Sequence, residues 1–193
     1  MTNTTSFFCG IRYALCLVAG LALAPLAGAW ELSGSKTISA VTREQQLIPI
    51  GQVTFSPAAN GAMAFSLRID HSRFADHFLS MKEFKCLEGA GEVLCHVPYP
   101  YKNPGTVSGS DFAWLEHSLL FLYKQPRDFG AKLWNGLYFR LQADAEGLVG
   151  LPQAVDLNLI SGPPDDLALP PYHAGLRDDV PPNAHWIERL VIR

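Results

Sequence analysis

Cys86 and Cys95 are the residues whose type and spacing most directly suggest chemistry, because they flank a short run that contains Gly89-Ala90-Gly91. If Ala90 and Gly91 form a two-residue turn, antiparallel pairing places the two cysteines opposite each other in a non-hydrogen-bonded pair, with Cα atoms about 4.5 Å apart. That separation lets a disulfide close, whereas a four-residue loop would reverse the alternation. We therefore predict a Cys86–Cys95 disulfide. Free thiols are the alternative, and a zinc site would need two further ligands at matching spacing.

Histidines and aspartates lie close together at two places, but their spacing does not suit a metal site. Asp70-His71 and Asp76-His77 are six residues apart, so they point to different sides of a helix and are too far apart on a strand to share an ion. The pairs Asp165-Asp166 and Asp178-Asp179 lack the spaced oxygen ligands of a calcium loop. The other histidines are isolated, as structural histidines often are: His96, His117, His173 and His185. We expect no metal and no cofactor.

Motifs for nucleophilic or nucleotide-dependent catalysis are missing from the sequence. Ser108 and Ser110 lie in a run without the G-x-S-x-G pattern of a nucleophile elbow. Gly89-Ala90-Gly91 lacks the third glycine and the following helix of a dinucleotide site, and neither H-E-x-x-H nor a P-loop is present. The sequence therefore favours a non-catalytic protein over an enzyme built from scattered residues.

Aromatic residues remain as candidates for ligand binding. Tyr99 and Tyr101 lie in a run stiffened by three prolines (98–104), and Trp134 and Tyr138 follow further along the chain. Such rings line the mouths of apolar pockets, which occur preferentially at barrel openings. We predict that these four residues contribute to the mouth of a ligand-sized apolar cavity. The alternative is that the rings close the ends of the core.

Strands must position most of these residues, because apolar and polar residues alternate with period two from Trp30 onward. The clearest alternation covers 63–69, 137–142 and 155–159, and less regular runs cover 30–41, 47–55, 82–87, 92–97 and 186–192. An Asn60-Gly61 pair between two of these runs is a strong hairpin signal. The pattern predicts a mainly β fold: one antiparallel β-barrel-like or β-sandwich domain of about eight strands.

Three segments depart from the strand pattern. A short helix is predicted between residues 70 and 82, where four residues recur at i, i+3, i+4 and i+7: Phe74, His77, Phe78 and Met81. The run 111–123 fits a helix and a strand, and its aromatic residues favour a strand in the second half. Residues 161–183 hold six prolines and four aspartates, which predicts a long surface loop before the last strand.

The first 29 residues have the order of a secretory signal peptide. Arg12 precedes an apolar run over 13–23, and Ala27-Gly28-Ala29 provides a small-residue cleavage site before Trp30. The run is shorter than the ~20 apolar residues of a transmembrane helix and is followed by Pro25. We expect a signal peptide over 1–29 and a single β-rich domain over 30–193.

Export changes how the cysteines are interpreted. Cys9 and Cys16 leave with the signal peptide, and no apolar run of the kind found before a lipoprotein cysteine precedes Cys16. Cys86 and Cys95 then form an even pair in the periplasm or outside the cell, where disulfides persist.

The charge balance argues against nucleic acid and anionic lipid as partners. Removing residues 1–29, whose one charged residue is Arg12, takes the formal charge from −3 to −4. Proteins that bind nucleic acid concentrate Lys and Arg on one face, and docking onto anionic lipid also needs a basic cluster. The sequence contains no such cluster.

These features predict an exported, non-catalytic β-domain that binds a small apolar ligand or a partner in the cell envelope, with no transmembrane segment in the mature chain. Two alternatives belong to other classes: an unrecognised periplasmic enzyme, which needs a polar cluster in a cavity, and a structural or assembly partner, which needs an exposed apolar patch. An outer-membrane barrel is disfavoured, because several strand runs are shorter than the ~9–11 residues of a membrane strand.

The cleavage site gives the first test. Intact mass spectrometry of the exported protein, combined with cell fractionation, is expected to give a mature chain that begins Trp30-Glu31. A full-length chain held in the inner membrane would contradict this prediction.

Overall fold

The computed structural model describes residues 1–2, 30–79, 82–130 and 132–193. The predicted signal peptide and its cleavage site fall mostly on residues 3–29, which lie outside the described residues. The strands are β1 (Gly34–Thr42), β2 (Leu47–Pro57), β3 (Met63–Ile69), β4 (Ala75–Leu79), β5 (Lys82–Gly89), β6 (Glu92–Val97), β7 (Thr106–Val107), β8 (Leu120–Lys124), β9 (Gly136–Ala143), β10 (Leu148–Val155), β11 (Asp178–Asp179) and β12 (Ile187–Ile192). The helix is α1 (Ala113–His117), and short 3-10 turns are η1 (Ala59–Gly61), η2 (His71–Arg73), η3 (Leu157–Ile160) and η4 (Ala174–Leu176).

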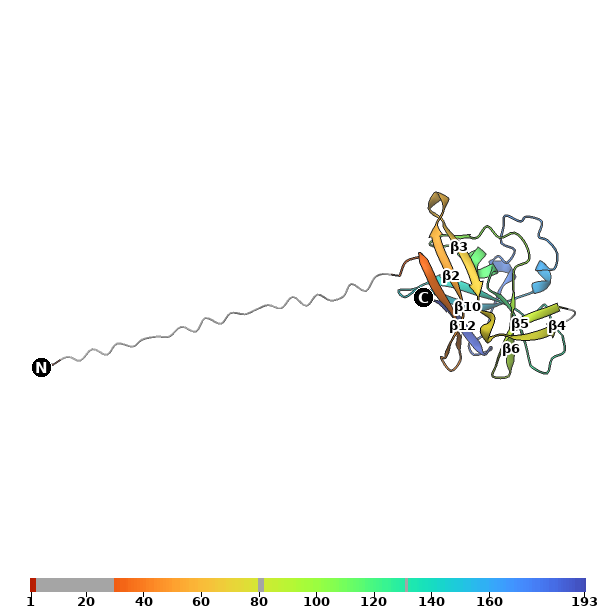
Figure 1. The fold of residues 1–193 in the computed structure, drawn as a ribbon, viewed down its shortest axis with the longest axis horizontal. Helices are drawn as coiled ribbons and strands as arrows, with labels where there is room; N and C mark the ends of the chain where they lie inside the picture. Colours follow the sequence, from red (N-terminus) through yellow and green to blue (C-terminus); the bar gives the residue numbers. More distant parts are fainter. Residues whose placement is uncertain (3–29, 80–81, 131) are drawn as a thin grey trace.

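All these strands belong to one antiparallel sheet, which confirms the mainly β prediction. Their order is β4-β5-β6-β8-β9-β10-β12-β1-β2-β3-β7, and β11 pairs with β10 outside this path. The sheet curls, with β2 and β3 on one side and β4, β5 and β6 on the other (Figure 1). It does not close, because β4 and β7 stand at its two edges in the described part of the chain. A groove lined by β3 and by His96 of β6 marks the open seam.

Apolar side chains cover both faces of the central strands. One core cluster joins residues of β1, β2, β8, β9 and β12, and therefore lies inside the curl. A second cluster lies on the opposite face of β8 and β9 and includes Leu120, Leu122 and Tyr138. Leu157, Ile160 and Tyr172, from the segment after β10, cover this outer face. Strands buried on both faces read as nearly continuous apolar runs, which is the pattern of β8 and the first half of β9.

The hairpin of β5 and β6 has the predicted register. Cys86 pairs with Cys95, and Gly89 pairs with Glu92 across a turn at residues 90–91. Gly91 has a φ of +77°, a conformation that glycine adopts without strain. The two cysteine Cα atoms lie 3.9 Å apart and the side chains are joined as a disulfide.

Glu92 connects this hairpin to the start of β12. Its carboxylate accepts a hydrogen bond of 2.7 Å from the Trp186 backbone N–H and lies 2.7 Å from His185 Nδ1. The Trp186 indole covers Gly89, where an added Cβ would lie 2.1 Å from the ring. Glycine at position 89 therefore allows the hairpin to pack under Trp186.

The predicted helix between residues 70 and 82 is wrong. Residues 75–79 form strand β4, which pairs with β5 in the register Ala75↔Cys86. Phe78, expected on a buried helix face, is 76% exposed, whereas Leu79 is buried. A segment this short has little helical stability of its own, so pairing with a neighbouring strand decides its structure. Met81 lies outside the described residues.

Two further predictions concern the chain around β8 and β10. The run 111–123 divides into α1 and β8, which confirms the strand in its second half. The strand predicted over 155–159 is wrong, because residues 157–160 form η3 with Asp156 accepting a hydrogen bond from Asn158 N at its start. The strand lies earlier, over 148–155, and replaces the predicted one, whereas the short β4, β7 and β11 raise the strand count above the predicted number.

Strand β10 escapes the sequence pattern because it contains Gly150 and Pro152. A Cβ at Gly150 would lie 3.1 Å from the side chains of Leu141 and Phe139. Pro152 lies between the residues that pair with β12 and those that pair with β11, so its missing N–H interrupts neither ladder. The neighbouring strands β9, β11 and β12 therefore explain why a glycine and a proline are tolerated in β10.

The proline-rich segment 161–183 is mostly exposed, as the surface-loop prediction requires. It is not wholly superficial, because Tyr172 is buried and residues 178–179 form β11 beside β10. We call residues 161–177 the proline-rich loop below.

Replacing both Cys86 and Cys95 by serine is expected to lower the free energy of unfolding by about 2–3 kcal/mol without abolishing the fold, because the cross-linked loop is short. Urea unfolding of the double variant and the wild type measures the difference. Thiol labelling of the unreduced, denatured wild type tests the bond itself, and two reactive thiols per chain would refute it.

Candidate functional site

Two of the four predicted binding residues, Tyr99 and Tyr138, pack against His117, and Tyr101 joins them through Tyr99. The ring centroids of Tyr99 and Tyr138 lie 5.8 Å and 5.3 Å from the imidazole, and Tyr101 lies 5.7 Å from Tyr99. Tyr138 is buried and the other two are partly buried, so the rings form a packed cluster on the outer face of the sheet. The fourth residue, Trp134, is 64% exposed in the connection between β8 and β9.

His117 connects the proline-rich loop to α1 through both ring nitrogens. Nδ1 lies 2.6 Å from the Ala113 carbonyl oxygen and donates to it, which leaves Nε2 to accept a hydrogen bond of 3.1 Å from the Tyr172 backbone N–H. The imidazole also stacks on the Tyr172 ring at 5.4 Å. Burial lowers the pKa of His117 to about 4, and the nearby charge of Arg177 adds to the effect. His117 is therefore neutral at physiological pH.

Glu116, the preceding residue, connects α1 to β9. One carboxylate oxygen accepts a hydrogen bond from the Tyr138 hydroxyl, and the other accepts one of 2.6 Å from the Leu141 backbone N–H. Strand β8 pairs with β9 at residues 136 and 137, so the carboxylate replaces a ladder partner further along β9. Burial raises the pKa of Glu116, while the two hydrogen bonds and the charge of Arg177 oppose the rise. Burial and the adjacent Glu116 also raise the pKa of Tyr138.

Arg177 completes this polar network at the end of the proline-rich loop. Its guanidinium carbon lies 4.6 Å from the centroid of the Tyr138 ring, within the range of a cation–π contact. Its Nε is buried and makes no hydrogen bond with the described residues. A buried donor without an acceptor is costly, and it needs an explanation.

A cleft of about 590 Å³ lies beside the network, between the sheet and the proline-rich loop, and we call it the loop cleft. Residues before and within α1, the middle of β9 and the loop itself line it: Ser110, Asp111, Phe112, Ala113, Glu116, Tyr138, Arg140, Leu141, Pro164, Asp166, Leu169, Pro170, Pro171, Tyr172, His173 and Arg177. The loop contributes prolines, Leu169 and Arg177 to the lining, whereas β9 contributes Tyr138, Arg140 and Leu141.

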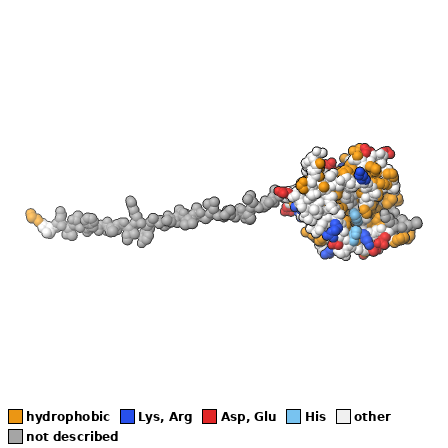
Figure 2. Space-filling model, turned by 45° about the horizontal axis from the view of Figure 1, so that its top comes forward, with side chains coloured by type: hydrophobic (Ala, Val, Ile, Leu, Met, Phe, Trp, Pro, Cys, Tyr) orange, Lys and Arg blue, Asp and Glu red, His pale blue; other side chains and the backbone are white. Residues whose placement is uncertain are grey.

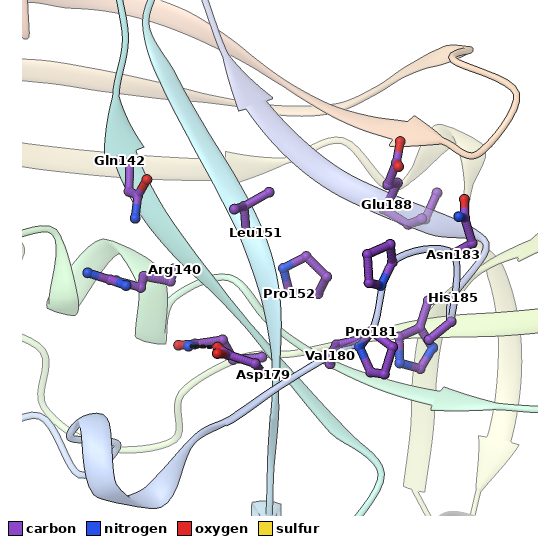
Figure 3. A pocket seen from close by; sticks show the side chains of 14 residues that line it. Arg140, Gln142, Leu151, Pro152, Asp179, Val180, Pro181, Asn183, His185 and Glu188 are labelled. Carbon is purple, nitrogen blue, oxygen red and sulfur yellow. Dashed lines mark hydrogen bonds between the residues drawn. The ribbon is translucent and has the colours of Figure 1, made fainter.

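A second cleft of about 420 Å³ lies on the other side of Arg140. Figure 3 shows its side chains from β9, β10 and the segment before β12, with Arg140 extending away from Pro181 and His185. Arg140 therefore borders both clefts.

Two more apolar grooves share His71 and His96, whose rings lie 6.3 Å apart. Tyr101 lines one of them and Tyr99 the other. Hydrophobic side chains gather beside histidines on the face of the domain shown in Figure 2. The three predicted tyrosines thus reach three different clefts at the outer surface, while core side chains occupy the inside of the curl.

The candidate metal-binding pairs have local structural partners. Asp70 accepts a hydrogen bond of 3.1 Å from Ser72 N at the start of η2, and Asp76 forms an ion pair with Lys85. His77 Nε2 lies 2.7 Å from Glu88 Oε1. Within the described ranges, no group of three or more His, Cys, Asp or Glu side chains is arranged to hold a metal ion.

Sequence reasoning missed Glu116, Tyr172 and Arg177 and treated His117 as isolated. One signal was available, because Glu116 and His117 interrupt a strongly apolar run at 112–123. Charged residues are rarely fully buried unless they are paired, so such an interruption predicts either a surface or a network. Their partners outside α1 lie 22 to 55 residues further along the chain, and no local pattern identifies them.

Fold and site together define a disulfide-bonded, mainly β domain with a polar network under a proline-rich loop. No protein-family model matches the chain, and neither a curated protein nor a solved structure matches it significantly. The described part of the chain contains no helix long and apolar enough to cross a membrane.

The stability of the fold is expected to fall as the pH falls from about 6.5 to about 4. The folded state holds His117 neutral, whereas the unfolded chain protonates near its ordinary pKa, so this contribution is fully present above that window and is lost through it. The shift corresponds to roughly 3 kcal/mol. Urea unfolding at a series of pH values measures it.

His117→Gln tests the assignment, because an amide can keep both hydrogen bonds without titrating. The variant is expected to have a flatter pH dependence in this window, whereas replacing the exposed His173 by Gln should leave the wild-type slope. Glu116, whose raised pKa acts in the opposite direction, is present in all three proteins. A wild-type slope in His117→Gln would contradict the prediction.

Proposed function

We propose that this chain is an exported, non-catalytic β-domain that binds a small ligand with an apolar body in the loop cleft. The observation that carries the proposal is the cleft itself: an open space of about 590 Å³ with an apolar wall and a few converging polar groups. Ligand sites usually measure about 300–1,000 Å³ and combine these two features.

The construction of the cleft supports ligand binding. Pro170 and Pro171 restrict the backbone of one wall, and the Tyr172 N–H that follows them is bonded to His117. The opposite wall is β9, a strand paired over its whole length with β10. Walls that are already ordered lose little conformational entropy when a ligand binds.

The state of the polar residues favours binding over catalysis. Both carboxylate oxygens of Glu116 and both nitrogens of His117 make hydrogen bonds within the domain. The raised pKa of Tyr138 makes its hydroxyl a poor proton donor to a substrate. These groups hold α1 and the loop against the sheet, so the role that the hydrogen bonds support for them is structural.

Export rests on the signal-peptide pattern of residues 1–29 and gains support from the disulfide, which is stable in the periplasm or outside the cell. The proposed compartment is therefore the cell envelope or the medium.

A second candidate is a partner-binding surface in the cell envelope. Four leucines on the segment 157–177 are between 40% and 63% exposed: Leu159, Leu167, Leu169 and Leu176. Exposed apolar side chains on one segment are a feature of interaction surfaces.

Filling the loop cleft is expected to remove the ligand. Ser110 is exposed and lines the cleft, so Ser110→Trp would place an indole in the space, whereas Ser56 is exposed on β2 and Ser56→Trp serves as the matched control. Native mass spectrometry of protein purified from its own cell envelope should show a bound small molecule in the wild type and the control, but not in Ser110→Trp.

Tryptophan fluorescence titrated with fatty acids and glycans gives an independent measurement of binding. No bound species and no fluorescence response in the wild type would overturn the proposal. A co-purified protein that Ser110→Trp retains would favour the partner-binding surface instead.

A further inference from the structure

Arg177 presents an unused hydrogen-bond donor beside the loop cleft. Its guanidinium lies over the Tyr138 ring, and its buried Nε has no hydrogen-bond acceptor among the described residues. A guanidinium has only N–H donors and no acceptor atom, so it cannot satisfy this donor itself. An acceptor from outside the chain would satisfy it.

Two further donors line the same cleft. Arg140 extends from β9, is exposed and makes no hydrogen bond or ion pair with the residues that the structure describes. His173 accepts a hydrogen bond from Gly175 N at Nδ1, so its neutral ring carries the proton on Nε2. Arg177, Arg140 and His173 therefore each have an N–H that a hydrogen-bond acceptor of a ligand can pair with.

The carboxylates that line the cleft are either satisfied or exposed. Glu116 uses both oxygens within the domain. Asp111 and Asp166 lie on the exposed rim, and each accepts a backbone hydrogen bond, from Ala113 N at 3.0 Å and from Ala168 N at 2.8 Å. Water and salt screen exposed charges more than buried ones, so the rim acids weaken the pull of the buried donor on an anion only in part.

Shape and charge together specify the ligand. The guanidinium fork matches a carboxylate, which it can hold through two parallel hydrogen bonds. The loop wall of Leu169, Pro170 and Pro171 offers apolar contact to the rest of the molecule. The rim acids Asp111 and Asp166 repel negative charge, so they disfavour a multiply charged anion more than a singly charged carboxylate.

We infer that the ligand of the loop cleft is a small organic monocarboxylate, whose carboxylate binds Arg177 and Arg140 and whose apolar body lies against the proline-rich wall. The inference rests on the proposed function, and it names the chemical class of that ligand.

Matched pairs of acid and amide test the inference. Benzoate, phenylacetate and octanoate, each beside its primary amide, are titrated into the mature domain by calorimetry at low ionic strength. We expect at least one acid to bind about tenfold more tightly than its amide, because the charge-assisted pair is lost in the amide. Rising salt concentration should weaken the binding of the acid and leave the binding of the amide unchanged.

Arginine variants locate the effect. Arg177→Gln is expected to lower the affinity for the acid about tenfold, so that the acid no longer binds more tightly than its amide. Arg140→Gln is expected to weaken it about threefold, because an exposed charge contributes less. Arg68→Gln is the control, since Arg68 lies on β3, outside the lining of the loop cleft, and bonds Gln52 at 3.1 Å. If thermal unfolding shows that Arg177→Gln does not fold, Arg140→Gln decides the result.

The outcomes separate the two proposals. Equal binding of acid and amide, or an acid preference that both cleft variants keep, overturns the carboxylate inference and leaves ligand binding standing. No binding of any acid to the wild type also overturns it. If native mass spectrometry then still shows a small molecule that Ser110→Trp loses, the proposed function survives, and if it shows none, both fail.

Discussion

The outer face of β8 and β9 is apolar and must be covered by a segment with almost no regular structure of its own. Sheets bury such a face under helices or under a second sheet, both of which pair their own backbone groups. Here the cover is the chain from η3 to Arg177, which contains four prolines and therefore cannot form a continuous helix. Its attachment therefore depends on a few particular contacts. Leu157, Ile160 and Tyr172 pack on the sheet, and hydrogen bonds join the Tyr172 N–H to His117, the Tyr101 hydroxyl to the Ile160 carbonyl oxygen and the Leu157 N–H to the Leu133 carbonyl oxygen.

The polar network follows from this requirement. A histidine that accepts from the cover must be neutral and correctly oriented, and the Ala113 carbonyl fixes its tautomer. A carboxylate beside it would be costly in an apolar layer unless donors satisfied both oxygens, and Tyr138 and the Leu141 N–H do so. The remaining charge, Arg177, closes the layer over Tyr138 and partly neutralises Glu116. Each member of the network thus offsets the cost of burying another. The exception is the Nε of Arg177, which has no acceptor among the described residues, and Arg177 lines the loop cleft.

The sequence predicted those features that depend on neighbours along the chain. The register of the disulfide hairpin followed from alternation and turn length, and the Asn60-Gly61 turn followed from its residues, which both adopt positive φ. The strand in the second half of residues 111–123 followed from its aromatic residues, whereas the helix before it was not decided. Features that depend on distant residues were missed: β4 became a strand because β5 was available, and β10 tolerates Gly150 and Pro152 because β9, β11 and β12 accommodate them. The same distinction holds for the aromatic residues. Tyr99, Tyr101 and Tyr138 were identified as candidates, but the packing of Tyr99 and Tyr138 on His117 depends on distant residues and was missed.

The bond between His117 and the proline-rich loop is made to a main-chain N–H, and this has an evolutionary consequence. Every amino acid except proline carries that group, so the attachment places little demand on side-chain identity in the loop beyond the ring that packs at position 172. Substitutions at the wall positions can accumulate without detaching the loop from the sheet. The side chains of the wall can therefore differ between related chains while the architecture stays the same, because the bond that attaches the loop does not depend on them.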